Sequence, residues 1–244
     1  MNCAFALDRI RIVLSRPSHP GNIGAAARAM KTMGLTRLWL VSPAAFPDPV
    51  ADARASGAGD VLASARVVST LEEALAGTVL AAAVTARRRE LSLPRLNARA
   101  AAAELVPWTE RGEIALVFGN ETSGLTNEEV GLCAMPVTIP TSPDFSSLNL
   151  GAAVQLLSYE LRMAVLEPAA VYTGDPQPQP ATHDEVEGFL AHLERAVTES
   201  GFHEPHNPRR LMPRFRRLFG RVRLEKEEVG ILRGMLSSFQ RKAE

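Results

Sequence analysis

The 244-residue chain has only two cysteines, few aromatic residues and no formal net charge at neutral pH. Cys3 and Cys133 lie far apart in the sequence, which indicates no disulfide framework and fits a reducing cytosol. Because basic and acidic residues balance, no positive field over the whole protein marks a nucleic-acid binder. Any such role must therefore depend on a local patch of charge.

Long hydrophobic runs are also missing from the chain. None reaches the span of a membrane helix, and the first ten residues lack the basic start and apolar core of a signal peptide. We therefore expect a soluble, cytoplasmic protein. The histidines form no HExxH motif, and the HEPH segment from His203 to His206 contains proline and has no further ligand cluster nearby. We expect no metal site.

The chain up to about Glu167 alternates short apolar runs with helical patterns. Strands are expected over residues 9–15, 37–43, 65–69, 78–85, 114–118 and 135–140, and helices over 23–33, 71–76, 97–108 and 150–165. Strands that alternate with helices predict an α/β fold in which helices cover both faces of a parallel sheet.

The composition changes after Glu167. Residues 168–182 read PAAVYTGDPQPQPAT, which is typical of an extended, proline-rich linker. Three helical patterns follow in residues 183–244, a segment too short to make a robust core alone. We therefore divide the chain into an α/β domain over 1–167, a linker over 168–182 and a small all-helical module over 183–244.

Polar, glycine-rich loops follow three of the expected strands. They are PGNIGAAAR from Pro20 to Arg28, GNETSG from Gly119 to Gly124, and SSLN from Ser146 to Asn149. The carboxyl ends of strands are where open α/β sheets bind ligands. Arg28 is a candidate for holding a phosphate or a reacting hydroxyl, although an ordinary surface arginine on a capped helix has the same spacing. Taken alone, Glu121 and the SSLN segment fit structural caps equally well.

Several other enzyme classes lack their signatures in these loops. GNETSG is not followed by the Lys-Ser/Thr pair of a phosphate loop, and the turn after the first strand lacks the full dinucleotide fingerprint. No Ser–His–Asp order is visible, so a hydrolytic triad is poorly supported.

A basic block occupies the C-terminal module. Between Pro205 and Arg223 there is no acidic residue, and the arginines are Arg209, Arg210, Arg214, Arg216, Arg217, Arg221 and Arg223. Charge runs are often solvated faces, but an acid-free block with interleaved Phe215 and Phe219 favours binding to a phosphate backbone. Arg87, Arg88 and Arg89 add positive charge near the loops.

Three segments, taken together, resemble the SPOUT class of RNA methyltransferases in the TrmH/TrmJ family. They are PSHPGNIGAAARAMKTMGL, FGNETSGLTNEE and IPTSPDFSSLNLGAAVQLLSYELR, and the resemblance covers residues 8 to 166. The segment NPRRLMPRFRRLFGRVRLEKEEVGILRGML resembles the C-terminal helical extension of the TrmJ type. That type implies a tRNA 2'-O-methyltransferase acting on nucleotide 32 of the anticodon loop, cytidine with uridine left open.

The resemblance also implies a deep C-terminal trefoil knot, a bound S-adenosylmethionine and a homodimer. By resemblance, Arg28 is the catalytic arginine, Asn22 and Glu121 support it, and Ser147 and Asn149 position the ribose or the cofactor. The implied cofactor contacts are Val84, Thr85, Ala86, Gly119, Asn120, Ile139, Ser147, Leu148 and Asn149. The implied RNA contacts are Arg87, Arg88, Arg209, Arg210, Arg214, Arg216 and Arg217. AVTAR at 83–87 departs from the Gly-Thr-Ser-like run of relatives, which puts side-chain detail there in doubt.

Two other functions stay open at this point. The chain could methylate ribosomal RNA or another tRNA position, or it could be a catalytically silent RNA-binding protein on the same scaffold. A small-molecule nucleotide enzyme is less well supported, because the phosphate-loop lysine is absent.

Overall fold

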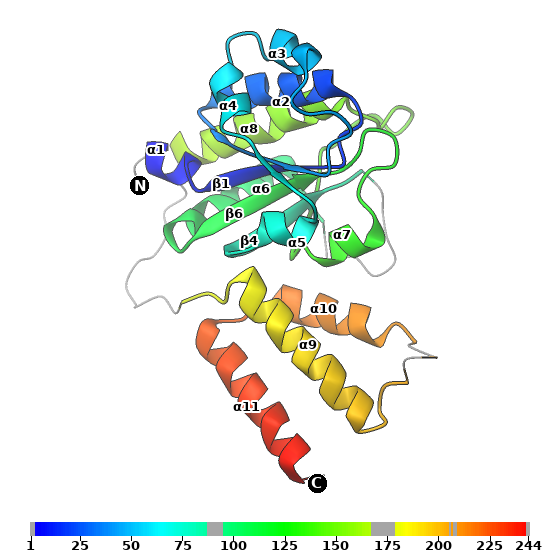
Figure 1. The fold of residues 1–244 in the computed structure, drawn as a ribbon. Helices are drawn as coiled ribbons and strands as arrows, with labels where there is room; N and C mark the ends of the chain where they lie inside the picture. The colour runs from blue at the N-terminus through cyan, green and yellow to red at the C-terminus, as the bar shows by residue number, and fades with distance from the viewer. Residues whose placement is uncertain (1–2, 87–94, 167–178, 205, 207–208, 243–244) are drawn as a thin grey trace.

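A parallel sheet forms the centre of the molecule (Figure 1). The computed structural model describes residues 3–86, 95–166, 179–204, 206 and 209–242. In that part of the chain the sheet has seven strands in the order β3-β2-β1-β6-β4-β7-β5, and every pair is parallel. The strands are β1 (Ile10–Ser15), β2 (Arg37–Val41), β3 (Arg66–Val68), β4 (Thr78–Val84), β5 (Leu96–Asn97), β6 (Glu113–Phe118) and β7 (Met135–Thr138).

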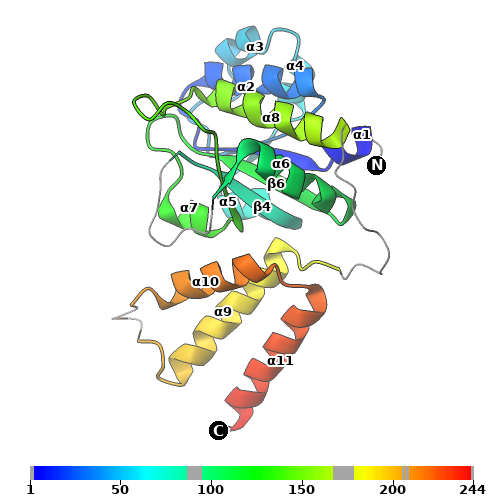
Figure 2. The same cartoon turned by 180° about the vertical axis from the view of Figure 1, so that it is seen from behind.

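Helices cover both faces of this sheet, as Figures 1 and 2 show. One face packs against α1 (Cys3–Leu7), α2 (Pro20–Met33), α3 (Pro49–Ala55), α4 (Gly59–Ala63), α6 (Ala98–Leu105) and α8 (Leu150–Leu166). The other face packs against α5 (Leu71–Leu75) and α7 (Asn127–Gly131), and a 3-10 turn, η1 (Val106–Glu110), follows α6. Alternate residues of each strand enter the two cores: Leu116 and Phe118 enter one, and Val117 enters the other.

The predicted α/β architecture is therefore confirmed, while several short elements escaped prediction. These are α1, α3, α4, α7 and β5, and each has eight residues or fewer. Segments this short carry too few periods of an apolar pattern to be recognised from one sequence. The deep trefoil knot stays a prediction.

The C-terminal residues form three helices, α9 (His183–Glu199), α10 (Leu211–Val222) and α11 (Lys226–Lys242). They enclose a small apolar cluster in which Phe189 meets Phe219 edge-on at 4.7 Å between ring centroids. We call this group the helical module. Residues 168–178, which make up most of the predicted linker, lie outside the described residues. Among the described helices, none is long and apolar enough to cross a membrane.

Few contacts tie the helical module to the α/β part. Asp184 accepts a hydrogen bond from the Gly77 N–H at 3.1 Å, and Arg223 forms an ion pair with Glu104. The Arg223 guanidinium also lies over the Trp108 ring, 5.4 Å from its centroid. A cavity of about 80 Å³ remains between the two parts. In both views α10 lies beside α7 (Figures 1 and 2).

Candidate active site

Asn22, Glu121 and Asn149 come from three distant segments and form one hydrogen-bonded chain. The Asn22 Nδ2 group donates to Glu121 Oε1 at 2.9 Å, and the Asn149 Nδ2 group donates to Asn22 Oδ1 at 2.9 Å. Asn149 Oδ1 accepts in turn from the Gly151 N–H at 2.9 Å, at the start of α8. The loops after β1, β6 and β7 therefore meet at one edge of the sheet, as parallel strands require.

Small residues allow α2 to pack closely against α8 and against α3. A Cβ on Gly151 would lie 2.7 Å from the Ala25 Cβ, and a Cβ on Gly24 would lie 2.1 Å from the Ala51 carbonyl oxygen. Neither position tolerates a side chain without a shift of backbone. The contact of Ala25 with Gly151 thus sets the distance across which Asn149 reaches Asn22, whereas Gly24 allows α3 to pack on α2.

Glu121 acts as an anchor for the first turn of α2. Its carboxylate accepts from the Ser18 N–H at 2.8 Å, from the Ser18 hydroxyl at 2.7 Å and from the His19 N–H at 3.3 Å, in addition to Asn22. Burial is the largest single influence and would raise its pKa, but the bonds from Ser18 and Asn22 together outweigh it and lower the pKa to about 2. Glu121 is therefore ionised and fully engaged at neutral pH, which makes it unsuitable as a proton acceptor.

Arg28 projects from the same helix as Asn22. It is exposed, and it makes no hydrogen bond or ion pair with any other residue that the structure describes. A guanidinium with its donors unused fits contact with a phosphate or an alkoxide oxygen, because it presents several N–H groups in a planar fork.

The proposed cofactor residues line the same edge. The Thr85 N–H donates to the Val137 carbonyl at 2.9 Å, so the end of β4 is tied to β7. Val84, Thr85 and Ile139 are half-buried, whereas Ala86 and the Ser147–Asn149 segment are exposed. A Cβ on Gly119 would lie 2.3 Å from the backbone of Gly124 and Leu125, so this tight loop needs glycine there.

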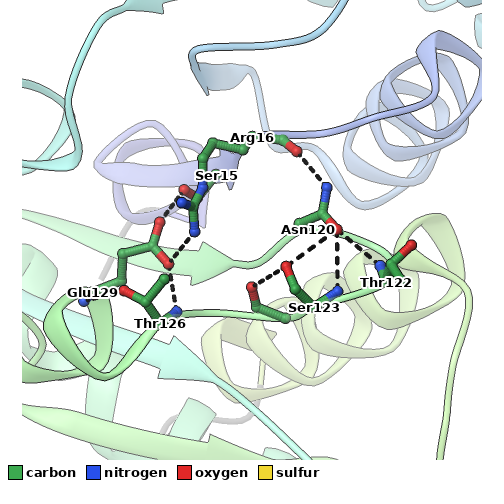
Figure 3. Close-up of polar contacts among 8 residues, drawn as sticks. Ser15, Arg16, Asn120, Thr122, Ser123, Thr126 and Glu129 are labelled. Carbon is green, nitrogen blue, oxygen red and sulfur yellow. Dashed lines mark hydrogen bonds and ion pairs between the residues drawn. The ribbon is translucent and has the colours of Figure 1, made fainter.

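Asn120 is turned toward its own loop rather than toward a ligand (Figure 3). Its Nδ2 group donates to the Arg16 carbonyl at 2.8 Å, and its Oδ1 accepts from the N–H groups of Thr122 and Ser123 at 2.9 and 3.1 Å. The side chain expected at the cofactor thus has a structural task. The Asn120 carbonyl also accepts from the Gly124 N–H at 2.8 Å, within the same loop.

Sequence reasoning missed a second carboxylate in this region, Glu129 of α7. Glu129 contacts Ser15 and Arg16 at the end of β1 and closes a capping box with Thr126 (Figure 3). The signal was present as the T-x-x-E pattern of LTNEE, which marks a helix start. The partner residues on β1 left no local trace because they lie more than one hundred residues away.

The arginine block divides into two groups in the structure. Arg216, expected at RNA, forms a bidentate ion pair with Glu187 of α9. In this pair the Arg216 Nη2 group donates to Glu187 Oε2 at 2.6 Å. Arg223 is paired with Glu104. The exposed members are Arg209, Arg210, Arg214, Arg217 and Arg221. Arg87, Arg88 and Arg89 lie outside the described residues.

Three of the exposed arginines share one face of α10. Arg214, Arg217 and Arg221 are spaced by three and four residues, which places them in line along the helix. The sequence predicted a basic block, but only the fold separates arginines that pair internally from those that face water.

Known proteins share both the site segments and the helical module. Residues 9–159 match the SpoU rRNA Methylase family, and residues 184–244 match the family described as tRNA methyltransferase TrmJ, C-terminal domain. A protein from Pseudomonas aeruginosa (strain UCBPP-PA14), the tRNA (cytidine/uridine/adenosine-2'-O-)-methyltransferase TrmJ, is 51% identical over 97% of this chain and 96% of its own length. This chain belongs to the TrmJ family of SpoU methylases.

Further comparisons agree with this membership. The Klebsiella pneumoniae tRNA (cytidine/uridine-2'-O-)-methyltransferase TrmJ is 47% identical over 96% of this chain and 97% of its own. The crystal structure of TrmJ from Z. mobilis ZM4 superposes with a TM-score of 0.82 at 36% identity, covering 94% of this chain and 98% of that one. AviRb from Streptomyces viridochromogenes, at 23% identity and a TM-score of 0.54, shares the fold over 66% of this chain and 62% of its own. The protein is a methyltransferase, so the expected enzyme class is confirmed.

Proposed function

We propose that the protein transfers a methyl group from S-adenosylmethionine to the ribose 2'-hydroxyl of nucleotide 32 in the tRNA anticodon loop. The observation that carries the proposal is the Glu121–Asn22–Asn149 chain, which joins the loops after β6 and β7 to the start of α2, the helix that also carries the exposed Arg28. The names of relatives that match nearly the whole chain describe tRNA 2'-O-methylation. Nucleotide 32 follows from the resemblance to the TrmJ type and is the part to be tested.

S-adenosylmethionine fits the chemistry of the loops after β4, β6 and β7. Half-buried Val84 and Ile139 offer apolar surface, and the loop backbones around Gly119 and Leu148 offer polar groups, a mixture that suits a nucleoside-bearing cofactor. AviRb, which has the same fold, has been solved in complex with AdoMet. When bound, the cofactor supplies an electrophilic sulfonium methyl group, and Val84, Thr85, Ala86, Gly119, Asn120, Ile139, Ser147, Leu148 and Asn149 are proposed to hold it.

Arg28 takes the central role in the proposed reaction. A ribose hydroxyl is a poor nucleophile near neutral pH, so its alignment and its developing negative charge both need support. The Arg28 guanidinium stays protonated and donates to the hydroxyl oxygen or the adjacent phosphate, stabilising the alkoxide as it forms. Ser147 and Asn149 position the ribose. Because Glu121 is held ionised by its donors, the proton passes to a phosphate oxygen or to water.

The tRNA backbone is proposed to lie along the exposed face of α10. Arg214 and Arg217 are exposed there beside α7, which follows the Glu121 loop. Arg209 and Arg210, at the start of α10, are exposed as well. Arg216 is better explained by its pair with Glu187 and is dropped from the proposed contacts.

The proposed active unit is a homodimer built on α8. Leu156 and Tyr159 of that helix are 42% and 45% exposed, and Phe145 in the preceding loop is 77% exposed. Exposed large apolar side chains on one helix and the loop before it are typical of an interface between chains. Light scattering at micromolar concentration should give the mass of two chains; the mass of one chain would remove this part of the proposal.

One assay tests the function directly. The purified chain is incubated with labelled S-adenosylmethionine and unmodified bulk tRNA, and 2'-O-methyl positions are mapped. Label at nucleotide 32 is the expected result. Label at another position would keep the chemistry and overturn the target, whereas cofactor binding without label on tRNA would direct the search to ribosomal RNA. Absence of cofactor binding would favour a silent scaffold.

A further inference from the structure

The turn that leaves β1 is bent at a residue in an unusual conformation. Arg16 has a φ of 51°, in the left-handed region, which is unfavourable for a residue with a Cβ. Such residues persist where their surroundings hold them, and they cluster at functional sites. Arg16 is held at three points: its N–H donates to the Val41 carbonyl at 2.8 Å, its carbonyl accepts from Asn120 at 2.8 Å, and its Nη2 lies 2.9 Å from Glu129 Oε2.

Glu129 joins this turn to the start of α7 (Figure 3). Its Oε2 accepts from the Thr126 N–H at 2.6 Å, and its own N–H donates to Thr126 Oγ1 at 3.1 Å. Its Oε1 accepts from the Ser15 hydroxyl. The Glu129 side chain is only 12% exposed, so this largely buried carboxylate connects the end of β1 to the first turn of α7. We name Ser15, Arg16, Thr126 and Glu129 the Glu129 clasp.

The Glu129 clasp lies directly upstream of the proposed catalytic groups. The chain passes from Arg16 through Ser18 and His19 into α2, which carries Asn22 and Arg28. The direction of α2 at its start therefore depends on how the turn at residue 16 is held. A displacement of about 1 Å at a reacting group is enough to slow a reaction on the order of a hundredfold.

We propose that Glu129 is a positioning residue for methyl transfer. By holding Ser15 and Arg16 it sets where α2 begins, and so it places Asn22 and Arg28 against the acceptor hydroxyl. Glu121 then secures the same turn further along, at Ser18 and His19. The inference rests on the proposed function only in taking that acceptor to be a ribose hydroxyl.

The primary test is Glu129→Gln in the full chain. Glutamine keeps an oxygen for the Thr126 N–H, so the helix start survives, but the ion pair with Arg16 is lost. We expect kcat on tRNA to fall about tenfold, a smaller loss than a full 1 Å displacement would cause. KM for tRNA and the affinity for S-adenosylmethionine, measured by calorimetry, should stay within about twofold of wild type, because the bonds that Asn120 makes to Thr122, Ser123 and Gly124 inside the cofactor loop do not involve the Glu129 clasp. Glu110→Gln, at an exposed carboxylate outside the Glu129 clasp, is the control and should behave as wild type.

A second variant separates positioning from stability. Arg16→Gly removes the guanidinium but suits the left-handed turn, so the thermal midpoint should hold or rise while kcat falls by a similar factor. The double variant should be no slower than either single variant, because both changes remove one interaction.

Three results would overturn the proposal. They are an unchanged kcat in both variants, additive losses in the double variant, and a loss of cofactor affinity that accounts for the whole effect. Hydrogen exchange of residues 16–22 in Glu129→Gln examines the Glu129 clasp without any substrate, and unaltered protection there would also overturn it. Failure of the wild type to methylate tRNA would instead count against the proposed function, so the two failures are distinguishable.

Discussion

The loop edge of the sheet and the face of α10 use polar residues in opposite ways. At the loop edge, Glu121 and Asn120 each satisfy several hydrogen bonds within the protein, whereas Arg28 of α2 makes none with the residues that the structure describes. On α10, Arg214 and Arg217 face solvent, while Arg216 is paired with Glu187. A reaction at one hydroxyl requires a catalytic group held in a fixed position. A phosphate backbone, in contrast, is bound by several positive charges whose exact positions matter less.

The largest expected effect comes from the loss of Arg28. Arg28→Ala should lower kcat by about a hundredfold or more, because the developing alkoxide loses its donor. Calorimetric affinity for S-adenosylmethionine should stay within about twofold, since Arg28 is not among the proposed cofactor contacts. Arg28→Lys, which keeps the charge without the planar fork, should recover part of the rate. An unchanged rate in Arg28→Ala would end the assignment.

A smaller effect is expected on the α10 face, where charge is shared. Replacing Arg214 and Arg217 together by alanine should weaken tRNA binding about tenfold and reduce the slope of log affinity against log salt by about two. Arg216→Ala is the matched control on the same helix. It should lower the thermal midpoint, because Glu187 is left unpaired, and keep the salt slope. The distinction between paired and exposed arginines would be wrong if Arg216→Ala changed the salt slope of tRNA binding as much as the double replacement of Arg214 and Arg217 does.

Acid should loosen the loop edge by protonating Glu121. The bonds from Ser18 and Asn22 lower the folded pKa of Glu121 from its ordinary value of 4.5 to about 2, so the stabilisation by Glu121 is present above pH 4.5 and is lost as the pH falls toward 2. Glu121→Gln should cost about 1–2 kcal/mol of unfolding free energy at neutral pH, after allowance for screening by solvent. The difference between variant and wild type should shrink below pH 4. A constant difference across that range would show that the charge of Glu121 is unimportant.

The smallest effect on stability is expected where Arg223 joins the helical module to the α/β part. Arg223→Ala removes an ion pair with Glu104 and a contact with Trp108, both partly exposed, and should cost about 1 kcal/mol or less. Hydrogen exchange should quicken in α10 while the sheet stays protected. Arg221→Ala, an exposed neighbour, should leave exchange in α10 as it is. Equal hydrogen exchange of α10 in both variants would mean that Arg223 does not hold the helical module against the α/β part.

Much of the architecture was visible in the sequence. Each expected strand occurs within two residues of its predicted bounds, because buried parallel strands are continuous apolar runs with clear ends. Gly34 closes α2 with a φ of 82°, as its place after Met33 predicts. The helical pattern of residues 211–222 likewise matches α10.

Partnerships across the chain escaped the same reasoning. Glu129 and Ser15 were overlooked, Asn120 was expected at the cofactor rather than in its own loop, and Arg216 was expected at RNA. Each of these interactions is a bond to a residue distant in sequence or a bond between near neighbours in one loop. Periodicity and spacing contain no information on such choices.

The sequence alone determined the pattern of strands and helices, the methyltransferase family and the identity of the polar loops. These features depend on local propensity and short motifs, which involve consecutive residues. Only the tertiary structure decided which polar groups satisfy each other and which remain for a ligand. A hydrogen bond depends on distances of a few ångströms between side chains, and those distances are set by the packing of α2 against α8 through Ala25 and Gly151. The free Arg28 and the engaged Glu121 are products of that packing.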